Sequence, residues 1–315
     1  MTKPLDKHNT ERTTTDSETT TIKRRAFLAG TGATAVGLSA MNSASAAEAD
    51  SDSSEASVNN TAISIKVLNW NIHHGTGMDG AYDLRRIADL IERSDADLVG
   101  IQEVDKHLAA RSNCDDQPQR LAERLNMNVD YAANITDYES SCTNQSRYGT
   151  AILTKRKYPI LESEHYELPS PQVEKGAYNE PRGLQETTVE IEDSKIRFYT
   201  THLDHLFKER RMAQVNAILD ITDDVSQPQV ITGDFNAVPD ADPINAMTGE
   251  YTDAFAAVGN DESDTYPAIY TDSAPQERID YVFASDDRIS VTEAGINEET
   301  LVSDHLPTFA DIRLH

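Results

Sequence analysis

The sequence is poor in cysteine, in basic residues and in long apolar runs, and each shortage excludes a class of protein. Only two cysteines occur in 315 residues, so a disulfide-dense scaffold and a zinc site built on paired cysteines are both excluded. No run of about eighteen or more apolar residues exists, which argues against a helix that spans a bilayer. Lysine and arginine total 28 against 54 acidic residues, and a net charge of −26 does not suit a protein that coats nucleic acid through bulk positive charge.

The surplus of acidic residues has a simple explanation in salt adaptation. A surface rich in Asp and Glu, with few Lys, stays hydrated where salt is molar, as in halophilic proteins. At about 1 M salt the Debye length is only about 3 Å, so an anionic ligand is repelled only at contact range. The acidity therefore does not exclude a nuclease, because local chemistry decides what binds.

The N-terminal segment differs in composition from the rest of the chain. Up to about Val58 it is rich in Thr, Ser, Asp, Glu and Ala, a composition that cannot bury enough apolar surface to fold. Within it, Lys-Arg-Arg-Ala-Phe-Leu at 23–28 precedes a weakly apolar run and Ala-Ser-Ala at 44–46, which resembles a twin-arginine export signal. The alternative is a chance basic pair in a disordered tail. We expect a signal peptide at 1–46, a disordered acidic linker at 47–60, a folded domain at 61–315 and a secreted protein.

The two cysteines, Cys114 and Cys142, both lie in polar segments rich in turn-forming residues. In an exported protein, two loop cysteines favour a disulfide over free thiols. We therefore expect a Cys114–Cys142 bridge, with two separate thiols as the alternative.

The apolar pattern predicts short strands separated by a few amphipathic helices. Strands are expected at 63–72, 98–101, 149–154, 183–191, 195–202, 228–233, 279–284 and 307–313. One helix follows Asp83, with Leu84 and Ile87 on its apolar face, and a second runs from about Phe207 with Met212, Val215 and Leu219 on one stripe. Because strands and helices do not alternate strictly, the pattern favours an α/β protein with sheet packed on sheet and helices outside over a parallel-only fold.

Polar residues interrupt this pattern at or near strand ends. They are Asn71, Glu103, Asp234, Asn236, Asp280, Asp304 and His305. A carboxylate among apolar residues costs several kcal/mol unless it is paired, hydrogen-bonded or bound to a metal, so several at strand ends indicate a shared purpose. Their oxygens suit Mg²⁺, Mn²⁺ or Ca²⁺, and the imidazoles of His202 and His305 suit acid–base work near neutral pH. Together they indicate metal-assisted hydrolysis of a phosphate ester.

Six motifs occur in an order that resembles the endonuclease/exonuclease/phosphatase superfamily. They are Asn69-Trp70-Asn71-Ile72, Ile101-Gln102-Glu103-Val104, Thr201-His202-Leu203, Gly233-Asp234-Phe235-Asn236, Arg278-Ile279-Asp280-Tyr281 and Ser303-Asp304-His305-Leu306-Pro307. That superfamily includes pancreatic-type deoxyribonucleases, exonuclease III type repair enzymes, inositol polyphosphate 5-phosphatases and neutral sphingomyelinases. The resemblance covers about 65–313, and six motifs in order leave little room for chance.

The resemblance implies a four-layer α/β sandwich, two packed mixed sheets flanked by helices, with the active site at one edge. By this likeness Glu103 is the principal Mg²⁺ ligand, beside Asn71 and supported by Asp304. Asp234 and Asn236 orient the attacking water, and His305 is a general base or transition-state contact held by Asp280 or Asp304. His202 is the second histidine, and Arg182 contacts the scissile phosphate. His73 and His74, just after Asn71, are equally interpretable as substrate contacts or bystanders.

The substrate is less clearly indicated. We expect a monomeric phosphodiesterase without a stable membrane anchor, and export favours nucleic acid as its substrate. Arg111, Arg147, Lys175 and Arg182 would form a local cationic rim or be ordinary surface charges. The alternative is a phosphomonoesterase, or a phosphoesterase like the sphingomyelinases or inositol phosphatases. A non-catalytic binding protein on the same scaffold is a third hypothesis, and the complete motif set argues against it.

Overall fold

Two six-stranded sheets, each centred on one parallel pair of strands, face one another in the protein. The structure is a computed structural model that describes residues 62–136, 142, 145–174, 176, 178–260, 263–269, 276–285, 288–299 and 301–315. The predicted signal peptide and acidic linker lie outside these residues. No helix in these ranges combines the length and apolar character needed to cross a bilayer.

The first sheet places its parallel pair between antiparallel neighbours. Its strands, in spatial order, are β11 (Ile289–Ile296), β12 (Thr308–Leu314), β1 (Ile63–Asn71), β2 (Leu98–Lys106), β4 (Arg147–Lys155) and β3 (Met127–Thr136). β1 and β2 are parallel, and the helix α1 (Leu84–Ser94) provides the crossover that a parallel connection needs.

The second sheet repeats this plan. Its strands, in spatial order, are β5 (Ile160–Leu168), β6 (Arg182–Ile191), β7 (Ser194–His202), β8 (Gln229–Asp234), β10 (Asp280–Ala284) and β9 (Thr252–Asp253). Here β7 and β8 are parallel and α3 (Lys208–Thr222) is the crossover. Both sheets are mixed, as predicted.

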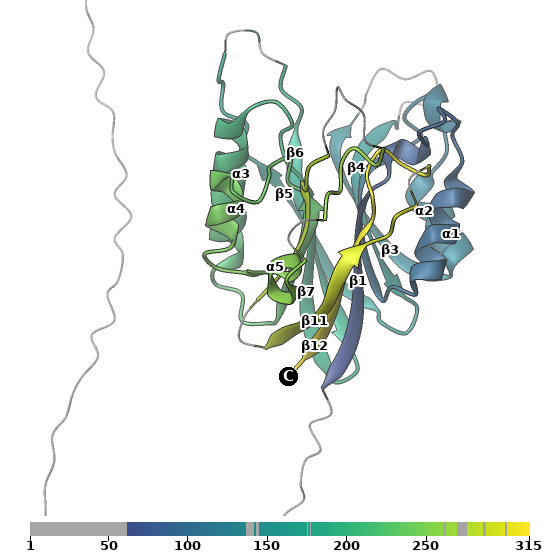
Figure 1. Cartoon of the computed structure of the whole chain (residues 1–315). Coiled ribbons are helices and arrows are strands. Elements are labelled where there is room, and N and C mark those ends of the chain that lie inside the picture. The colour runs from purple at the N-terminus through teal and green to yellow at the C-terminus, as the bar shows by residue number, and fades with distance from the viewer. Residues whose placement is uncertain are drawn as a thin grey trace, which may run out of the picture. The chain divides into compact units, whose positions relative to one another are not determined.

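Helices cover the outer faces of both sheets, so the molecule has four layers (Figure 1). α1 and α2 (Gln117–Leu125) lie over the first sheet, whereas α3 and α4 (Asp242–Met247) lie over the second. The short α5 (Ala254–Val258) contributes to the core between the sheets, and two 3-10 turns, η1 (His73–Gly75) and η2 (Ala110–Ser112), complete the helical elements of the described residues. The predicted layered α/β architecture is confirmed.

β1 is buried on both faces, which explains its mixed composition. Leu68 and Trp70 pack toward the helices, whereas Ile65 and Val67 pack between the sheets. Asn69 lies on the same face as Val67 and reaches the facing sheet. The polar residues at the end of this strand, Asn69 and Asn71, are therefore buried, whereas Ser64 near its start is exposed.

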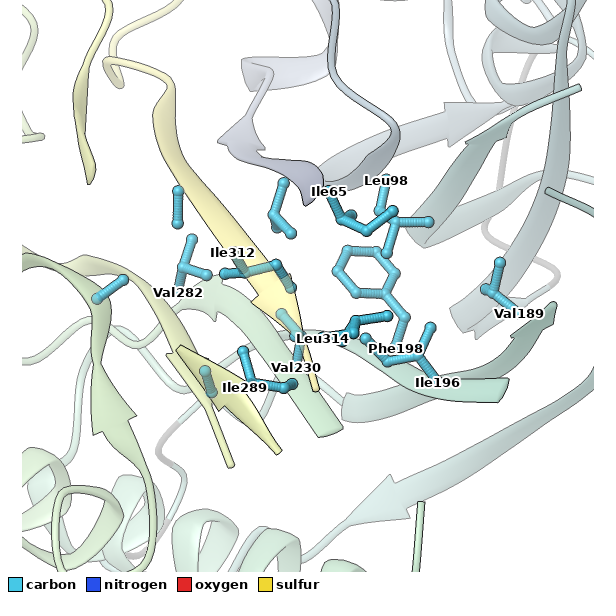
Figure 2. Packing of buried hydrophobic residues seen from close by; sticks show 14 of the residues in the cluster. Ile65, Leu98, Val189, Ile196, Phe198, Val230, Val282, Ile289, Ile312 and Leu314 are labelled. Carbon is cyan, nitrogen blue, oxygen red and sulfur yellow. The ribbon is translucent and has the colours of Figure 1, made fainter. Parts of the chain in front are cut away.

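The contact between the sheets is apolar over much of its area. Phe198 from β7 lies at its centre, surrounded by Ile65, Leu98, Ile312 and Leu314 from the opposite sheet (Figure 2). Burial at about 25 cal/mol per Å² of apolar surface makes such a cluster the main stabilising contribution of the fold.

The predicted apolar stripe of α3 is wrong in detail. Met212 is only partly buried, whereas Arg210 and Gln214 are fully buried. These side chains face inward because they hold the loop that follows β7. Arg210 Nη1 donates to Asp204 Oδ2 at 3.1 Å, and Gln214 Oε1 accepts from the backbone N–H of Asp204 at 2.9 Å.

Candidate active site

Three strands end at one edge of the sandwich, and each ends on a polar residue that sequence analysis had selected. β1 ends at Asn71, β7 at His202 and β8 at Asp234. Their antiparallel partners begin at the same edge, so β6 starts with Arg182 and β10 with Asp280. A cavity of about 400 Å³ lies at this edge. It is lined by Glu103, Tyr148, Glu180, Arg182, His202, His205, Asp234, Asn236, Tyr266, Ile279, Asp304 and His305.

Glu103 reaches the cavity through a β-bulge. Ile101 pairs with Ala151 and Val104 pairs with Gly149, so Gln102 and Glu103 together oppose a single residue of β4. Glu103 has a φ of 58°, an uncommon conformation for a non-glycine residue. The expectation that β2 ends at Glu103 is wrong, because the strand continues to Lys106. The bulge re-aims one side chain without ending the strand, as bulges near active sites often do.

Asn71 joins two of the predicted site carboxylates. Its amide nitrogen donates to Glu103 Oε1 at 3.2 Å and to Asp234 Oδ2 at 3.1 Å. Its amide oxygen accepts from the backbone N–H of His73 at 3.0 Å. In this arrangement Asn71, which the resemblance made a metal ligand, orients the two carboxylates through its nitrogen.

His305 is held by Asp280, which decides between the two partners that the resemblance left open. Its Nδ1 donates to Asp280 Oδ2 at 2.9 Å, and its Nε2 lies 3.7 Å from Asp234 Oδ2. Burial alone would lower the pKa of His305, but the carboxylates of Asp280 and Asp234 raise this pKa to about 10. Asp280 is itself fixed, because the hydroxyl of Thr265 accepts from its backbone N–H at 3.2 Å.

His202 and Asp234 lie against one another on neighbouring strands. His202 Nε2 is 3.4 Å from Asp234 Oδ2, and both side chains are buried. Burial, and next the positive charge of Arg182, holds the pKa of His202 well below its usual range. Burial raises the pKa of Asp234 to about 7, against the opposing charge of His305. Asp280, His305, Asp234 and His202 thus form one continuous chain of carboxylates and imidazoles.

Arg182 and Asn236 border this chain. Arg182 is only 3% exposed, with Nη1 3.0 Å from Glu180 Oε1 and Nη2 donating to His205 Nδ1 at 3.1 Å. The backbone N–H of Asn236 donates to Asp234 Oδ1 at 2.9 Å, which fixes that carboxylate from the side opposite Asn71. Every site residue proposed from the sequence lines the cavity except Asn71 and Asp280, which contact the lining residues from behind.

Sequence reasoning missed several neighbours of the site or gave them little weight. His74 Nδ1 lies 3.8 Å from Glu103 Oε2, and His73 Nδ1 lies 3.7 Å from Asp304 Oδ1. The ring of Tyr266 lies 4.6 Å, centre to centre, from that of His305. The only sequence feature that pointed to His73 and His74 was their position directly after Asn71. No sequence feature pointed to Tyr266, because its approach to His305 depends on the tertiary fold.

The donor set fits a hard divalent cation. Burial alone would raise the pKa of Glu103, but His74, the positive charge of His202 when protonated and the amide of Asn71 hold this pKa well below its usual range. Carboxylate oxygens on the cavity wall, from Glu103 and Asp304, are the ligands that Mg²⁺ and Mn²⁺ prefer. Asp234, Asp280 and His305 also place one ligand atom each within 4.8 Å of the others, an arrangement that would suit a metal ion.

The two cysteines form a disulfide, as predicted, with their Cα atoms 5.5 Å apart. The bridge joins the connection that follows β2 to the connection between β3 and β4. Two members of the predicted cationic rim are paired, Arg111 with Asp105 and Arg182 with Glu180, whereas Arg147 is exposed at the start of β4. Lys175 lies outside the described residues.

Comparison with known proteins shows the family to which the chain belongs. A model of the Endonuclease/Exonuclease/phosphatase family matches residues 68–305. A protein of this family from Beutenbergia cavernae is 24% identical, with a TM-score of 0.64, over 80% of this chain and 72% of its own. The mannosyl-6-phosphatase of Bacteroides thetaiotaomicron is 20% identical, with a TM-score of 0.61, over 79% and 99% of the two chains. The human Nocturnin catalytic domain, solved with a bound sulfate anion, is 20% identical, with a TM-score of 0.60, over 80% and 94%. The chain therefore belongs to the endonuclease/exonuclease/phosphatase family, whose members are metal-dependent phosphoester hydrolases.

Proposed function

We propose that this chain is an exported, divalent-metal-dependent phosphodiesterase that cleaves nucleic acid. One observation carries the proposal: Glu103, Asp234 and His305 come from three distant parts of the sequence and line one cavity. Each side chain is buried or partly buried and forms a hydrogen bond with a further polar residue. Such pre-organisation is what phosphoryl transfer requires.

The arrangement supports in-line attack of water on phosphorus. Asp234, held by Asn71 and the Asn236 backbone, orients the water and accepts its proton as the new P–O bond forms. His305 and His202, on either side of Asp234, contact the phosphoryl oxygens, and His305, whose pKa of about 10 keeps it protonated near neutral pH, gives a proton to the leaving oxygen as the old P–O bond breaks. A metal ion held by Glu103 and Asp304 would neutralise charge that develops on these oxygens.

The charges of the cavity favour a diester over a monoester. Four carboxylates line it, from Glu103, Glu180, Asp234 and Asp304, whereas the single arginine, Arg182, is already paired with Glu180. A phosphodiester carries one negative charge at neutral pH and a monoester carries close to two. Even with metal bound, the diester meets less repulsion. A phosphomonoesterase remains the second candidate, because one solved relative is a mannosyl-6-phosphatase.

A substrate panel tests the activity. The purified full chain is assayed at high salt, with Mg²⁺ or Mn²⁺, on plasmid DNA, RNA, bis-p-nitrophenyl phosphate, sphingomyelin, inositol phosphates and mannose 6-phosphate. We expect hydrolysis of the nucleic acids, its loss with EDTA and its return with added metal. The His305→Ala variant, purified in parallel, controls for contaminating nucleases. Activity confined to mannose 6-phosphate or to a lipid headgroup would reject the nuclease assignment.

Export is tested separately. Residues Arg24 and Arg25, followed by the small residues at 44–46, support passage through a twin-arginine pathway. Replacing both arginines by lysine should leave the chain unprocessed inside the cell, whereas the unchanged chain appears outside and shortened by about 46 residues. Equal secretion of the two forms would reject this route.

A further inference from the structure

A second cleft lies next to the active-site cavity and differs from it in character. Its volume is about 310 Å³, and its walls include Leu108, Ile135, Tyr148 and Tyr178. Tyr148 and Glu180 line both spaces, so the cleft adjoins the cavity that would hold the scissile phosphate. A substituent attached to that phosphate can therefore extend into the cleft.

The charged groups at this cleft are already neutralised. Arg111 makes a bidentate contact with the buried Asp105, with Nε 3.0 Å and Nη2 2.8 Å from its two oxygens. Glu180 is paired with Arg182. The cleft therefore presents no unpaired charge from these groups to a second phosphate, which disfavours a polyphosphorylated ligand.

Aromatic rings and a guanidinium plane form the main binding surface of this cleft. The Tyr178 side chain is 59% exposed, and the guanidinium carbon of Arg111 lies 5.8 Å from the centre of the Tyr148 ring. Tyrosine rings and arginine planes are the groups on which unstacked bases stack in single-stranded nucleic acid. Leu108 and Ile135 add apolar contact at the edges.

We propose that this cleft binds the nucleobase of a nucleotide next to the scissile phosphate, with Tyr178 as a stacking platform. The inference rests on the proposed nuclease function and extends it to the substrate class. Single-stranded or locally unpaired nucleic acid is the substrate that can turn a base into the cleft. Because every base has a π-face, the cleft tolerates all four bases.

The walls of the cleft are held in place before substrate binds. The Cys114–Cys142 disulfide ties the segment that carries Arg111 to the segment that precedes Tyr148. On the other side, Arg210 Nη1 donates to the backbone oxygen of Tyr178 at 2.8 Å, so the backbone is fixed independently of the tyrosine ring. Replacing the Tyr178 ring leaves this backbone hydrogen bond in place.

The test compares two diesters with the same phosphate. One is a dinucleotide, and the other is the same diester with one base replaced by hydrogen on a tetrahydrofuran sugar. Each is assayed with the unchanged chain, Tyr178→Ala, Tyr178→Phe and a control, Leu161→Ala, which removes a 42% exposed side chain from β5. We expect Tyr178→Ala to lower kcat/KM for the dinucleotide about 5- to 100-fold. Tyr178→Phe and Leu161→Ala should stay near the unchanged chain.

The abasic diester separates stacking from a general defect. The unchanged chain should cleave it more slowly than the dinucleotide, and Tyr178→Ala should change that rate little. Equal losses on both diesters, or no loss on either, would overturn the inference while leaving the nuclease function intact. If neither diester is cleaved, the proposed function fails and the base site fails with it. A loss of activity by Tyr178→Ala on mannose 6-phosphate alone would assign the cleft to a sugar.

Discussion

The interface between the two sheets has an apolar half and a polar half, and the same strands build both. Along β7, Phe198 is followed on the same face by Thr200 and His202. Along β8, Val230 is followed by Thr232 and Asp234. The sandwich thus changes from a core to an active site within a few residues of each strand.

The two halves are held together by different interactions. The apolar half is stabilised by burial, which depends little on direction. In the polar half, Gln102 Nε2 donates to Asn69 Oδ1 and to Thr200 Oγ1, both at 2.8 Å, across strands of both sheets. A buried hydrogen bond adds only about 1 kcal/mol, but an unmade one costs about 1–3 kcal/mol. The apolar half therefore supplies stability, and the polar half supplies the position of the site.

The largest expected effect comes from removing a reacting group in the polar half. His305→Ala should lower kcat about 10²- to 10⁴-fold, because it removes the imidazole between Asp280 and Asp234. The free energy of unfolding should fall as well, because the buried Asp280 and Asp234 lose their positive partner, so kcat is compared per folded molecule. His165→Ala, which removes an exposed imidazole from β5, is the control. Near-normal turnover of His305→Ala would show that the site is misassigned.

Removing a large side chain from the apolar half should lower stability without lowering kcat. Phe198→Ala is expected to lower the free energy of unfolding by about 3–5 kcal/mol, because it leaves a cavity at the centre of the interface. Urea denaturation measures this loss. Below the melting temperature, kcat per folded molecule should stay within about twofold of the unchanged chain, a factor of two being worth about 0.4 kcal/mol. A large loss of kcat would mean that the two halves are not separable.

Gln102→Leu tests the boundary between the halves. The substitution keeps the volume but leaves Asn69 and Thr200 without their shared partner, which should cost about 1–3 kcal/mol of unfolding free energy. Because Gln102 adjoins Glu103 in the bulge, kcat should also fall, by about 10- to 100-fold. Urea denaturation and steady-state kinetics on one preparation measure both. If stability falls alone, the polar half does not position the site.

Much of the division between an apolar half and a polar half can be predicted from the sequence. Strands with alternating apolar residues predicted the sandwich, and the structure brings the polar strand ends at Asn71, His202 and Asp234 to one edge of it. Loop cysteines, in a chain whose N-terminal segment resembles an export signal, predicted the disulfide. These features succeed because strand alternation and local residue type are properties of short segments.

The features that the sequence did not predict depend on contacts between distant segments. β5 was missed because its sequence is mostly polar and exposed, so no apolar alternation marks it. In β11 a bulge between Val291 and Glu293 interrupts the alternation. The bulge at Glu103 was missed for a related reason, since its positive φ is maintained by the surrounding sheet and not by residue type.

Removing a helix cap far from the interface should have the smallest effect on stability, and it serves as a control for the other substitutions. Asp83 accepts from the backbone N–H of Arg85 at 3.0 Å at the start of α1, outside both halves. Asp83→Ala should lower the free energy of unfolding by about 1 kcal/mol, and kcat should not change. This loss falls within the range expected for Gln102→Leu, so the pair separates stability from positioning. If kcat fell equally in both variants, marginal stability alone would explain the loss, and the polar half would have no special role.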